Sequence, residues 1–336
     1  MPTVAINTSI PTLCVHQPLD STAKLNYTYR NKLVNGGFNV WQRGVTFALL
    51  APSYTADRWY ISNPVAVTRE AFLPGESELM DNAKYYLKND LTVSLPASME
   101  QRIEGVETLA GKQVTLTFWA KSGISGSIIP ITIIQNFGTT GSPSTSVTTV
   151  VGSATLTAAW VKHTMTVTLP SIAGKTLGTD GNDYVALKIT LPVDAISICN
   201  MQLEQGPLAT DFEIRPYDEE VRLCRRYYEQ IDLNLDQVAF SGIGISGTEA
   251  VFVIPYQEKR IVPAITVPST LKIYLNANTP TWSDTLARTL PTVDLVAAPS
   301  KVIGNKFATV ASGLVAGTVV LGTASAACSV LINAEL

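Results

Sequence analysis

The chain has 336 residues, enough for about two domains, and carries 24 lysines and arginines against 27 acidic residues. The formal net charge of -3 gives no electrostatic reason to expect a nucleic-acid partner. Only 15% of the residues are charged, whereas threonine, serine and valine recur throughout, which is typical of β-rich proteins with neutral polar faces. The composition therefore predicts a protein built mostly of sheet and argues against polyanion binding.

Residues 1–32 contain few periodic apolar positions and are predicted to form an N-terminal arm that becomes ordered on a partner. The opening "MPTVAINTSIPTLCV" has neither a basic region nor a continuous apolar stretch, so it does not resemble a secretory signal. The cysteines at 14, 199, 224 and 328 show neither CxxC spacing nor a compact framework, which predicts free thiols without zinc or disulfides. We therefore expect the chain to fold in a reducing cytoplasm.

The stretch "NGGFNVWQRG", residues 35–44, is rich in glycine but does not have the spacing of a phosphate-binding loop. It contains no lysine, and its first two glycines are adjacent. We interpret it as a turn that leads an extended segment into a sheet, with Phe38, Val40 or Trp41 buried.

Alternation of apolar and polar residues predicts strands in "QVTLTFWAK", "HTMTVTL" and "YVALKITL". The first of these places Phe118 on one face and Trp119 on the other. Turn clusters such as "GTTGSPSTS" and "GTDGND" separate the strands. Because the strands alternate with turns and not with helices, the sequence predicts an all-β fold with an antiparallel sandwich over residues 33–216.

One short helix is predicted within "PYDEEVRLCRRYYEQI", as part of a helical linker over residues 217–234. An apolar seam with 3-4-3 spacing runs along it and consists of Val221, Cys224, Tyr228 and Ile231. Fewer than two heptads cannot specify a coiled coil, so the seam could contact another subunit or pack on the chain's own sandwich.

Residues 235–336 return to short strands and prolines and are predicted to form a second, smaller β-domain. Within it, residues 307–334 are uncharged for longer than the roughly 20 residues of a membrane-spanning helix. Residues 122–161 are equally uncharged and rich in Gly, Ser, Thr and Pro, so uncharged runs are general in this chain. We therefore predict strands there and no membrane insertion.

Residues able to carry chemistry are sparse. The two histidines, His16 and His163, have no evident serine or cysteine partner, which makes a nucleophilic triad improbable. A carboxylate pair for glycoside cleavage stays open, because such pairs assemble from distant strands. Glu100, Glu104 and Glu107 are more simply interpreted as solvated charges near a turn. We predict no catalytic residues, no metal ligands and no enzymatic activity.

Aromatic residues are the better indication of function. The stretch "YTADRWY" places aromatic rings around Asp57 and Arg58, and rings that line a groove can stack on sugars. The alternative is that Trp59 is a core residue and that Asp57 pairs with Arg58 locally. The candidates for glycan binding are Tyr54, Tyr60 and Trp119.

Four stretches, "LVNGGFNVWQRG", "YTADRWY", "EQRIEGVETLAGKQVTLTFWAKS" and "MQLEQGPLATDFEIRPYDEEVRLCRRYYE", follow one another between residues 33 and 230. In this order they resemble the C-terminal carbohydrate-binding-like region of phage and prophage tail fibre proteins. The resemblance implies a jelly roll, with its first strand at residues 35–44 and its last strand ending at Met201–Glu204 beside it. Further on, "VFVIPYQEKRIVPAITV" and "INAEL" resemble the small β-domain that often finishes such fibres.

The resemblance implies a non-enzymatic virion protein, a tail fibre or related appendage subunit that is assembled in the host cytoplasm. It further implies a homotrimer, whose arm contacts other virion proteins and whose β-domains bind host surface glycans. Related sandwiches often hold a structural calcium, but Asn39 and Asn200 stand where a carboxylate is expected, so we expect no cofactor. The alternatives are a glycan depolymerase, whose usual β-helix repeats are absent here, and a stand-alone carbohydrate-binding module.

Overall fold

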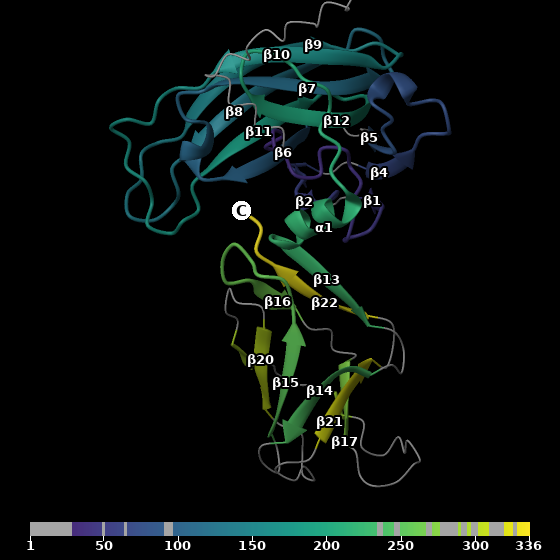
Figure 1. Cartoon of the computed structure of the whole chain (residues 1–336), viewed down its shortest axis with the longest axis vertical. Helices are drawn as coiled ribbons and strands as arrows, with labels where there is room; N and C mark the ends of the chain where they lie inside the picture. Colours follow the sequence, from purple (N-terminus) through teal and green to yellow (C-terminus); the bar gives the residue numbers. More distant parts are fainter. Residues whose placement is uncertain are drawn as a thin grey trace, which may run out of the picture.

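A computed structural model describes residues 29–48, 51–63, 66–90, 97–233, 238–244, 249–266, 271–275, 288–289, 294–296, 302–308, 319–324 and 328–336. Two six-stranded sheets form a sandwich, and a helix and two further sheets follow them along the chain. Figure 1 shows the sandwich at the top and the later strands below it. The predicted arm lies outside the described residues up to position 28.

We name the first sheet of the sandwich sheet A. Its strands, in spatial order, are β1 (Thr46–Ala48), β4 (Ala66–Ala71), β5 (Tyr85–Asp90), β12 (Ala195–Gln205), β7 (Gln113–Ser122) and β10 (Val161–Thr168). The short 3-10 helix η1 (Glu78–Met80) lies between β4 and β5 in the chain.

The second sheet, sheet B, completes the sandwich. Its strands, in spatial order, are β2 (Ser53–Tyr54), β3 (Tyr60–Ile61), β6 (Ala97–Glu104), β11 (Tyr184–Leu191), β8 (Ile128–Asn136) and β9 (Val147–Thr155). A second 3-10 helix, η2 (Val106–Leu109), follows β6. Neighbouring strands in both sheets pair antiparallel, which confirms the predicted all-β jelly-roll sandwich.

The core lies between the two sheets and follows the alternation seen in the sequence. Leu116 and Phe118 of β7 face Leu187 and Ile189 of β11 from the opposite sheet, and all four side chains are buried. Each fully buried side chain of this size contributes about 1.5–3 kcal/mol to folding. The intervening residues point to the outer faces, which we define as the faces turned away from the other sheet.

Residues 35–44 form a buried turn and not the first jelly-roll strand that the resemblance implied, because left-handed backbone at Asn35 (φ 58°) and Phe38 (φ 52°) interrupts any extended run. Phe38, Val40 and Trp41 are buried, as the turn interpretation predicted. The turn still lies beside β12, since the Met201 amide donates to the Gly36 carbonyl oxygen at 2.9 Å. A Cβ on Gly36 would collide with the Met201 carbonyl, so only glycine fits there.

The sandwich begins earlier than the boundary at residue 33. The buried Asn31 side chain donates to the Met201 carbonyl oxygen at 2.9 Å, and the Lys32 amide donates to the Leu203 carbonyl oxygen at 2.8 Å. Residues 31 and 32 are therefore fixed along β12, because these two hydrogen bonds tie their backbone and side chain to the sheet. This corrects the end of the predicted arm.

The helix α1 spans Tyr217–Arg225 and is shorter than predicted. Tyr228 and Ile231 lie on the strand β13 (Tyr228–Leu233), so the predicted seam does not run along one helix. The prediction was wrong because β13 pairs with β22 (Cys328–Asn333), and a partner about a hundred residues away leaves no trace in local spacing. Of the seam residues on the helix, Cys224 is buried and Val221 is half-buried.

The strands that follow α1 form two sheets. The first has three strands in the order β13, β22 and β16 (Ala264–Thr266). The second has seven strands in the order β18 (Arg288–Thr289), β17 (Leu271–Leu275), β21 (Val319–Ala324), β14 (Val238–Gly244), β15 (Glu249–Pro255), β20 (Val302–Ala308) and β19 (Asp294–Val296). The uncharged run after residue 307 contributes β21 and β22 within its described residues.

The sandwich and the three-stranded sheet meet at a buried ionic contact, which we name the joint and define as Arg43, Arg58, Tyr227, Tyr228 and Glu335. Arg58 is 1% exposed and its guanidinium pairs with the Glu335 carboxylate. Arg43 approaches the same carboxylate at 3.2 Å. The Arg58 guanidinium carbon lies 3.4 Å from the ring centroid of Tyr227, and the Arg43 guanidinium carbon lies 3.4 Å from that of Tyr228. Both cations of the joint are thus paired and stacked.

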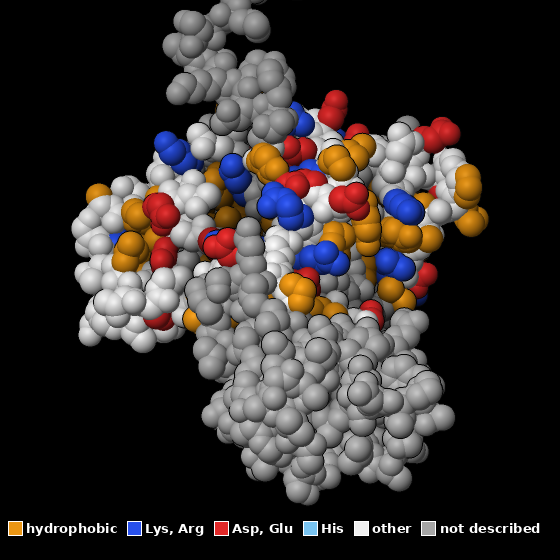
Figure 2. Space-filling view, turned by 60° about the horizontal axis from the view of Figure 1, so that its bottom comes forward, with side chains coloured by type: hydrophobic (Ala, Val, Ile, Leu, Met, Phe, Trp, Pro, Cys, Tyr) orange, Lys and Arg blue, Asp and Glu red, His pale blue; other side chains and the backbone are white. Residues whose placement is uncertain are grey.

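Basic and acidic side chains are interspersed on the face of the sandwich that Figure 2 shows, without one patch of a single sign. This distribution agrees with the small net charge and gives no support for polyanion binding. In the described part of the chain, no helix has the length and apolar character needed to cross a membrane.

Candidate functional site

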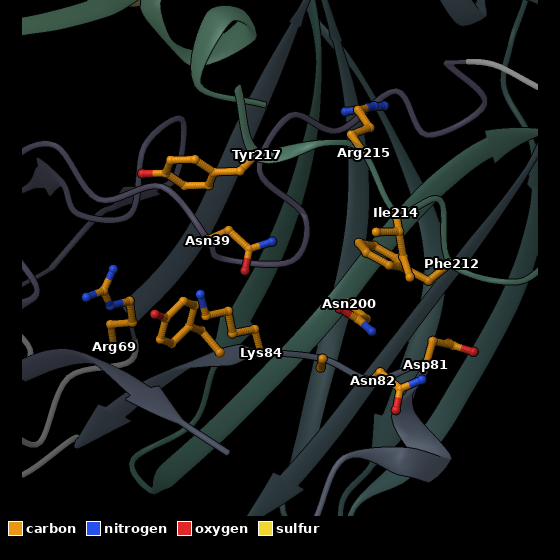
Figure 3. A pocket seen from close by; sticks show the side chains of 12 residues that line it. Asn39, Arg69, Asp81, Asn82, Lys84, Asn200, Phe212, Ile214, Arg215 and Tyr217 are labelled. Atoms are coloured by element: carbon orange, nitrogen blue, oxygen red, sulfur yellow. The ribbon is translucent and has the colours of Figure 1, made fainter. Parts of the chain in front are cut away.

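A cavity of about 400 Å³ opens beside β12, an inner strand of sheet A. We name it the amide pocket, because three asparagines line it. Asn39 comes from the turn after residue 35, Asn82 from the loop after η1, and Asn200 from β12. The segment from Phe212 to Tyr217, which leads into α1, lines another side of the cavity, as Figure 3 shows.

Unusual backbone shapes this pocket. Asn200 has a φ of 47° and sits where the register of β12 shifts against β7. Asp81 and Asn82 also have left-handed backbone, at 51° and 53°. Asparagine and aspartate adopt this conformation more readily than other side chains, because their short polar groups can bond locally. The Asn200 amide donates to the Met80 carbonyl oxygen at 2.7 Å and so fixes the loop after η1 against the bulge.

The side-chain oxygen of Asn39 is the pocket atom that we take as the main indication of a binding site. This Oδ1 is buried and has no hydrogen-bond partner among the described residues of the protein. A Cβ on Gly37 would lie 3.0 Å from Asn39 Nδ2 and 3.6 Å from Asn200 Oδ1, so the glycine leaves room for both amides. Leaving such an acceptor unsatisfied costs about 1–3 kcal/mol, which a donor entering the pocket would offset.

Apolar surface faces these amides. Tyr217 is 61% exposed and Ile214 is 70% exposed, and both line the pocket together with Phe212. Figure 3 shows Phe212 and Ile214 on one side of the cavity and Tyr217 on the other. A combination of exposed ring faces with a few fixed polar groups is typical of sites for small polar ligands.

Charged groups at the pocket are largely engaged with other residues. The Arg69 guanidinium lies 4.5 Å from the ring centroid of Tyr85. Arg215 pairs with Glu213 at 3.1 Å and with Glu220 at 3.4 Å. Lys84 also lines the pocket and is exposed, with its ammonium 5.2 Å from the Tyr85 ring centroid, so one cation stands beside the neutral amides and hydroxyls that can bond a ligand.

Asp81 supplies the carboxylate of the pocket lining and approaches Lys162 at 3.9 Å. Glycoside hydrolysis ordinarily uses two carboxyl groups, and Asp81 is the one carboxylate among the described residues that line the pocket. The structure brings together Asn39 and Asn200, the two residues that stand at the expected calcium position. Calcium takes six to eight oxygen ligands and favours carboxylates, and no group of three or more His, Cys, Asp or Glu suited to a metal occurs among the described residues. The donor set does not fit a calcium site.

The structure separates the predicted glycan-binding residues. Tyr54 and Tyr60 lie together on sheet B, with ring centroids 5.3 Å apart, whereas Trp119 lies on the outer face of sheet A. The Tyr54 hydroxyl donates to the Leu336 carbonyl oxygen at 3.0 Å, and burial raises the pKa of Tyr54 to about 12. Tyr54 therefore supports the contact between the sandwich and residues 335–336, and sugar binding by these three residues stays a prediction.

The structure also decides between the two interpretations of Trp59 and Asp57. Trp59 is a core residue, as the alternative interpretation held, but Asp57 does not pair with Arg58. Asp57 instead accepts the Gln42 amide at 2.9 Å and lies 3.8 Å from Arg43. Its partners come from the preceding turn, because Arg58 points toward Glu335.

The glutamates near η2 are not all solvated charges. Glu100 is 9% exposed and bonds the Arg102 side chain at 2.7 Å. Glu104 bonds the Arg226 side chain at 2.8 Å, across the contact with α1, whereas Glu107 is exposed. Both corrected residues lie on β6; the partner of Glu100 is two residues further along the same strand, and the partner of Glu104 lies at the end of α1.

Sequence reasoning missed most of the amide pocket. Phe212, Ile214 and Tyr217 lie within "DFEIRPY", a stretch used only for the resemblance. Nothing in the sequence indicated that Asn82 could bind a ligand. Asp81 next to it and Gly75 earlier in the chain indicate only a loop. The asparagines come from three separate segments, so no spacing rule could have joined them.

Comparisons with known proteins found similarity among solved structures only. No protein-family model matches the sequence, and no curated protein matches it. Among solved structures, the CBM22-2 xylan-binding domain of Paenibacillus barcinonensis Xyn10C is 12% identical, with 44% of this chain and 92% of that chain covered and a TM-score of 0.32. A structure described as a putative sugar binding protein from Bacteroides thetaiotaomicron is 17% identical, with 52% and 100% covered and a TM-score of 0.34.

A phage protein is also similar in part. The enzymatically active domain of tailspike protein 4 from bacteriophage CBA120 is 16% identical, with 53% of this chain and 22% of that chain covered and a TM-score of 0.32. These identities and TM-scores are too low to transfer a function, which has to be argued from the chain's own residues.

Proposed function

We propose that this chain is a non-enzymatic glycan-binding subunit of a phage tail fibre or related virion appendage, and that it takes part in host recognition. The observation that carries the binding role is the amide pocket, with its buried and unpartnered Asn39 oxygen beside exposed apolar side chains. The appendage role is supported by the resemblance of residues 33–230 to tail fibre proteins.

A neutral sugar suits this pocket better than an apolar or strongly charged ligand. A pyranose presents hydroxyl donors at its edge and apolar C–H groups on its faces. One hydroxyl would donate to Asn39 Oδ1, and the side-chain amides of Asn82 and Asn200 offer both donors and acceptors. The apolar face of the ring would stack against Tyr217, which is 61% exposed.

Binding without hydrolysis is the expected activity, because Asp81 is the one carboxylate of the lining and lies near Lys162. A depolymerase would need a second carboxyl group placed across a bound sugar. A stand-alone carbohydrate-binding module would share the pocket but would not assemble on a particle.

Trimer formation and attachment to the virion belong to the same proposal. Several modest sites on one appendage raise the effective local concentration of binding groups, so weak sugar affinities become useful avidity. The seam of Val221, Cys224, Tyr228 and Ile231 gives no support, since it is divided between α1 and β13. The number of three subunits therefore rests on the resemblance. Light scattering should give three times 36.1 kDa, and a mass near 36.1 kDa would contradict the trimer.

The binding role can be tested with the full chain on a panel of neutral oligosaccharides and bacterial surface polysaccharides. For a glycan that binds, Asn39→Ala and Tyr217→Ala should each weaken the affinity about tenfold. Asn136→Ala on β8 and Leu208→Ala, which removes a side chain that is 75% exposed, are matched controls outside the pocket.

Reducing-end release measured on the same samples separates binding from hydrolysis. Binding without release supports the proposal, whereas release that disappears on substitution of a carboxylate supports the depolymerase. The absence of binding to every glycan of the panel, or unchanged affinity in both pocket variants, would refute the amide pocket as the site.

A further inference from the structure

The outer face of sheet A holds a second hollow beyond the loop that follows η1. The strand register places Lys88 of β5 opposite Ser197 of β12, and Ser197 opposite Lys121 of β7. Leu87 and Ile198, the neighbours of these residues in the chain, are buried in the core. The three polar side chains therefore point outward in one row across three adjacent strands.

We name this hollow the lysine groove and define it by Lys88, Lys121 and Ser197 with the small residues Gly123 and Ala195. Its volume is about 290 Å³. The small residues leave space between the two lysines, and none of the residues that line it also lines the amide pocket. The groove is thus a separate place for a ligand on the same face of the sandwich.

Aromatic rings lie beside Lys121, one of the residues that line the groove. Phe72, Tyr86 and Trp160 form a triangle with ring centroids 4.8–5.3 Å apart. All three are half-buried, so part of their surface is exposed. Lys121 Nζ lies 5.1 Å from the Trp160 centroid and 5.7 Å from that of Tyr86. A cation so close to ring faces is held in place by its attraction to them.

The two lysines of the groove differ in whether an acidic residue pairs with them. Lys88 pairs with Asp90 at 3.0 Å, but Lys121 has no acidic partner among the described residues. The nearby Asp194 is engaged elsewhere, because its carboxylate accepts hydrogen bonds from Ser127 Oγ at 2.5 Å and from a backbone amide at 3.2 Å. The groove therefore presents one uncompensated ammonium beside partly exposed rings.

From this arrangement we propose that the lysine groove binds an acidic saccharide unit, a hexose that carries a carboxylate. The carboxylate pairs with Lys121, a hydroxyl of the same sugar bonds Ser197, and the apolar side of the sugar ring packs against Trp160. The proposal rests on the glycan-binding role proposed above, but it assigns a second site and a different ligand class from those of the amide pocket.

The test compares a tetrasaccharide of galacturonic acid with its carboxyl-reduced galactose counterpart, using the full chain and isothermal titration. The acidic tetrasaccharide should bind about tenfold more tightly than the reduced one, and this preference should shrink as salt is raised. Lys121→Gln should abolish the preference, and Lys121→Arg should retain most of it.

Lys188→Gln is the matched control, because Lys188 is a half-exposed lysine on the outer face of the opposite sheet. It should leave the preference unchanged. Ser197→Ala serves as a second groove variant that removes one hydroxyl and little volume, and it should weaken acidic binding about threefold. Unfolding midpoints measured for each variant show whether the variant folds.

The outcomes separate the two proposals. Loss of acidic binding in Lys121→Gln with unchanged neutral binding, and the reverse in Asn39→Ala, supports two sites. Equal or absent binding of the two tetrasaccharides, or a preference that survives Lys121→Gln, overturns the acidic site. Neither of these results touches the neutral glycan site, which depends on Asn39 and Tyr217.

Discussion

The joint and the outer face of sheet A differ in how far the protein itself supplies partners for their polar groups. In the joint, the buried Arg58 guanidinium pairs with a carboxylate and stacks on an aromatic ring, although its Nε has no hydrogen-bond partner among the described residues. On the outer face, Asn39 Oδ1 is buried without a partner and Lys121 lacks a counter-ion among the described residues. The first arrangement holds two parts of one chain together, whereas we propose that a ligand completes the second.

The difference gives a way to distinguish structural from binding residues in a single fold. Substitution at a satisfied network should lower stability and leave glycan affinity unchanged. Substitution at an unsatisfied group should do the reverse. Stability and affinity should therefore be measured on the same variants.

The largest effect is expected at the joint. Glu335→Ala leaves the buried Arg58 without its carboxylate, and breaking such a pair costs about 3–5 kcal/mol of unfolding free energy. Urea unfolding of the full chain measures this loss. The double variant Arg58→Met with Glu335→Ala should recover part of it, because no buried charge is then unpaired. A loss below about 1 kcal/mol would show that the joint is not a stabilising contact.

The second largest effect is expected at Asn39, where a substitution should raise the unfolding free energy. Asn39→Ala removes a buried acceptor that has no partner, so the unfolding free energy should rise by about 1 kcal/mol while glycan affinity falls. Urea unfolding and titration of one preparation measure both quantities. A fall in both would indicate that Asn39 is a structural residue and would remove the contrast with the joint.

His163 gives a smaller, pH-dependent effect. Its ring stacks on Phe118 with centroids 5.2 Å apart, and burial lowers the pKa of His163. The unfolded chain then binds the proton more readily than the folded one, so stability is lost as pH falls below the usual histidine value of about 6.5. The loss should stay under about 1 kcal/mol, and His163→Gln should make the unfolding free energy flatter between pH 5 and pH 7. An unchanged pH profile in that variant would assign the dependence to another group.

The smallest effect is expected at an exposed ion pair on α1. Arg222 bonds Glu219 at 2.6 Å, and this bond, together with one from Tyr29, lowers the pKa of Glu219 to about 2. The pair is open to solvent, so Arg222→Ala should cost about 0.5 kcal/mol or less in urea unfolding. A cost close to that of Glu335→Ala would mean that burial does not explain the strength of the joint.

Local sequence predicted the strands that carry the core. The alternation around Phe118 and through Leu187 matches β7 and β11, because strand period depends on adjacent residues alone. The seam at Tyr228 and Ile231 failed for the converse reason. Its helix-like spacing competed with pairing to β22, a partner distant in sequence, and the pairing prevailed.

The binding residues were harder to predict. Asn39 and Asn200 were selected as a pair through the resemblance, and the structure does place them in one pocket. The exposed Tyr217 and Trp160, which lies beside Lys121 of the lysine groove, were missed, because outward-facing rings differ from core rings only by where other strands lie. Trp119, chosen for facing away from Phe118, packs like Trp160 and Tyr86 against the small buried cluster of Met80, Ala83 and Cys199.

Translation order has a consequence at the joint, because Glu335 follows Arg58 by 277 residues in the chain. Until Glu335 has been synthesised, the sandwich can form only with the Arg58 guanidinium unpaired with that carboxylate. Tyr227, also synthesised long before Glu335, can cover that cation in the interim by stacking on it. The nascent sandwich should therefore have a lower unfolding free energy than the sandwich of the full chain. This free energy should rise when residues 328–335 emerge from the ribosome.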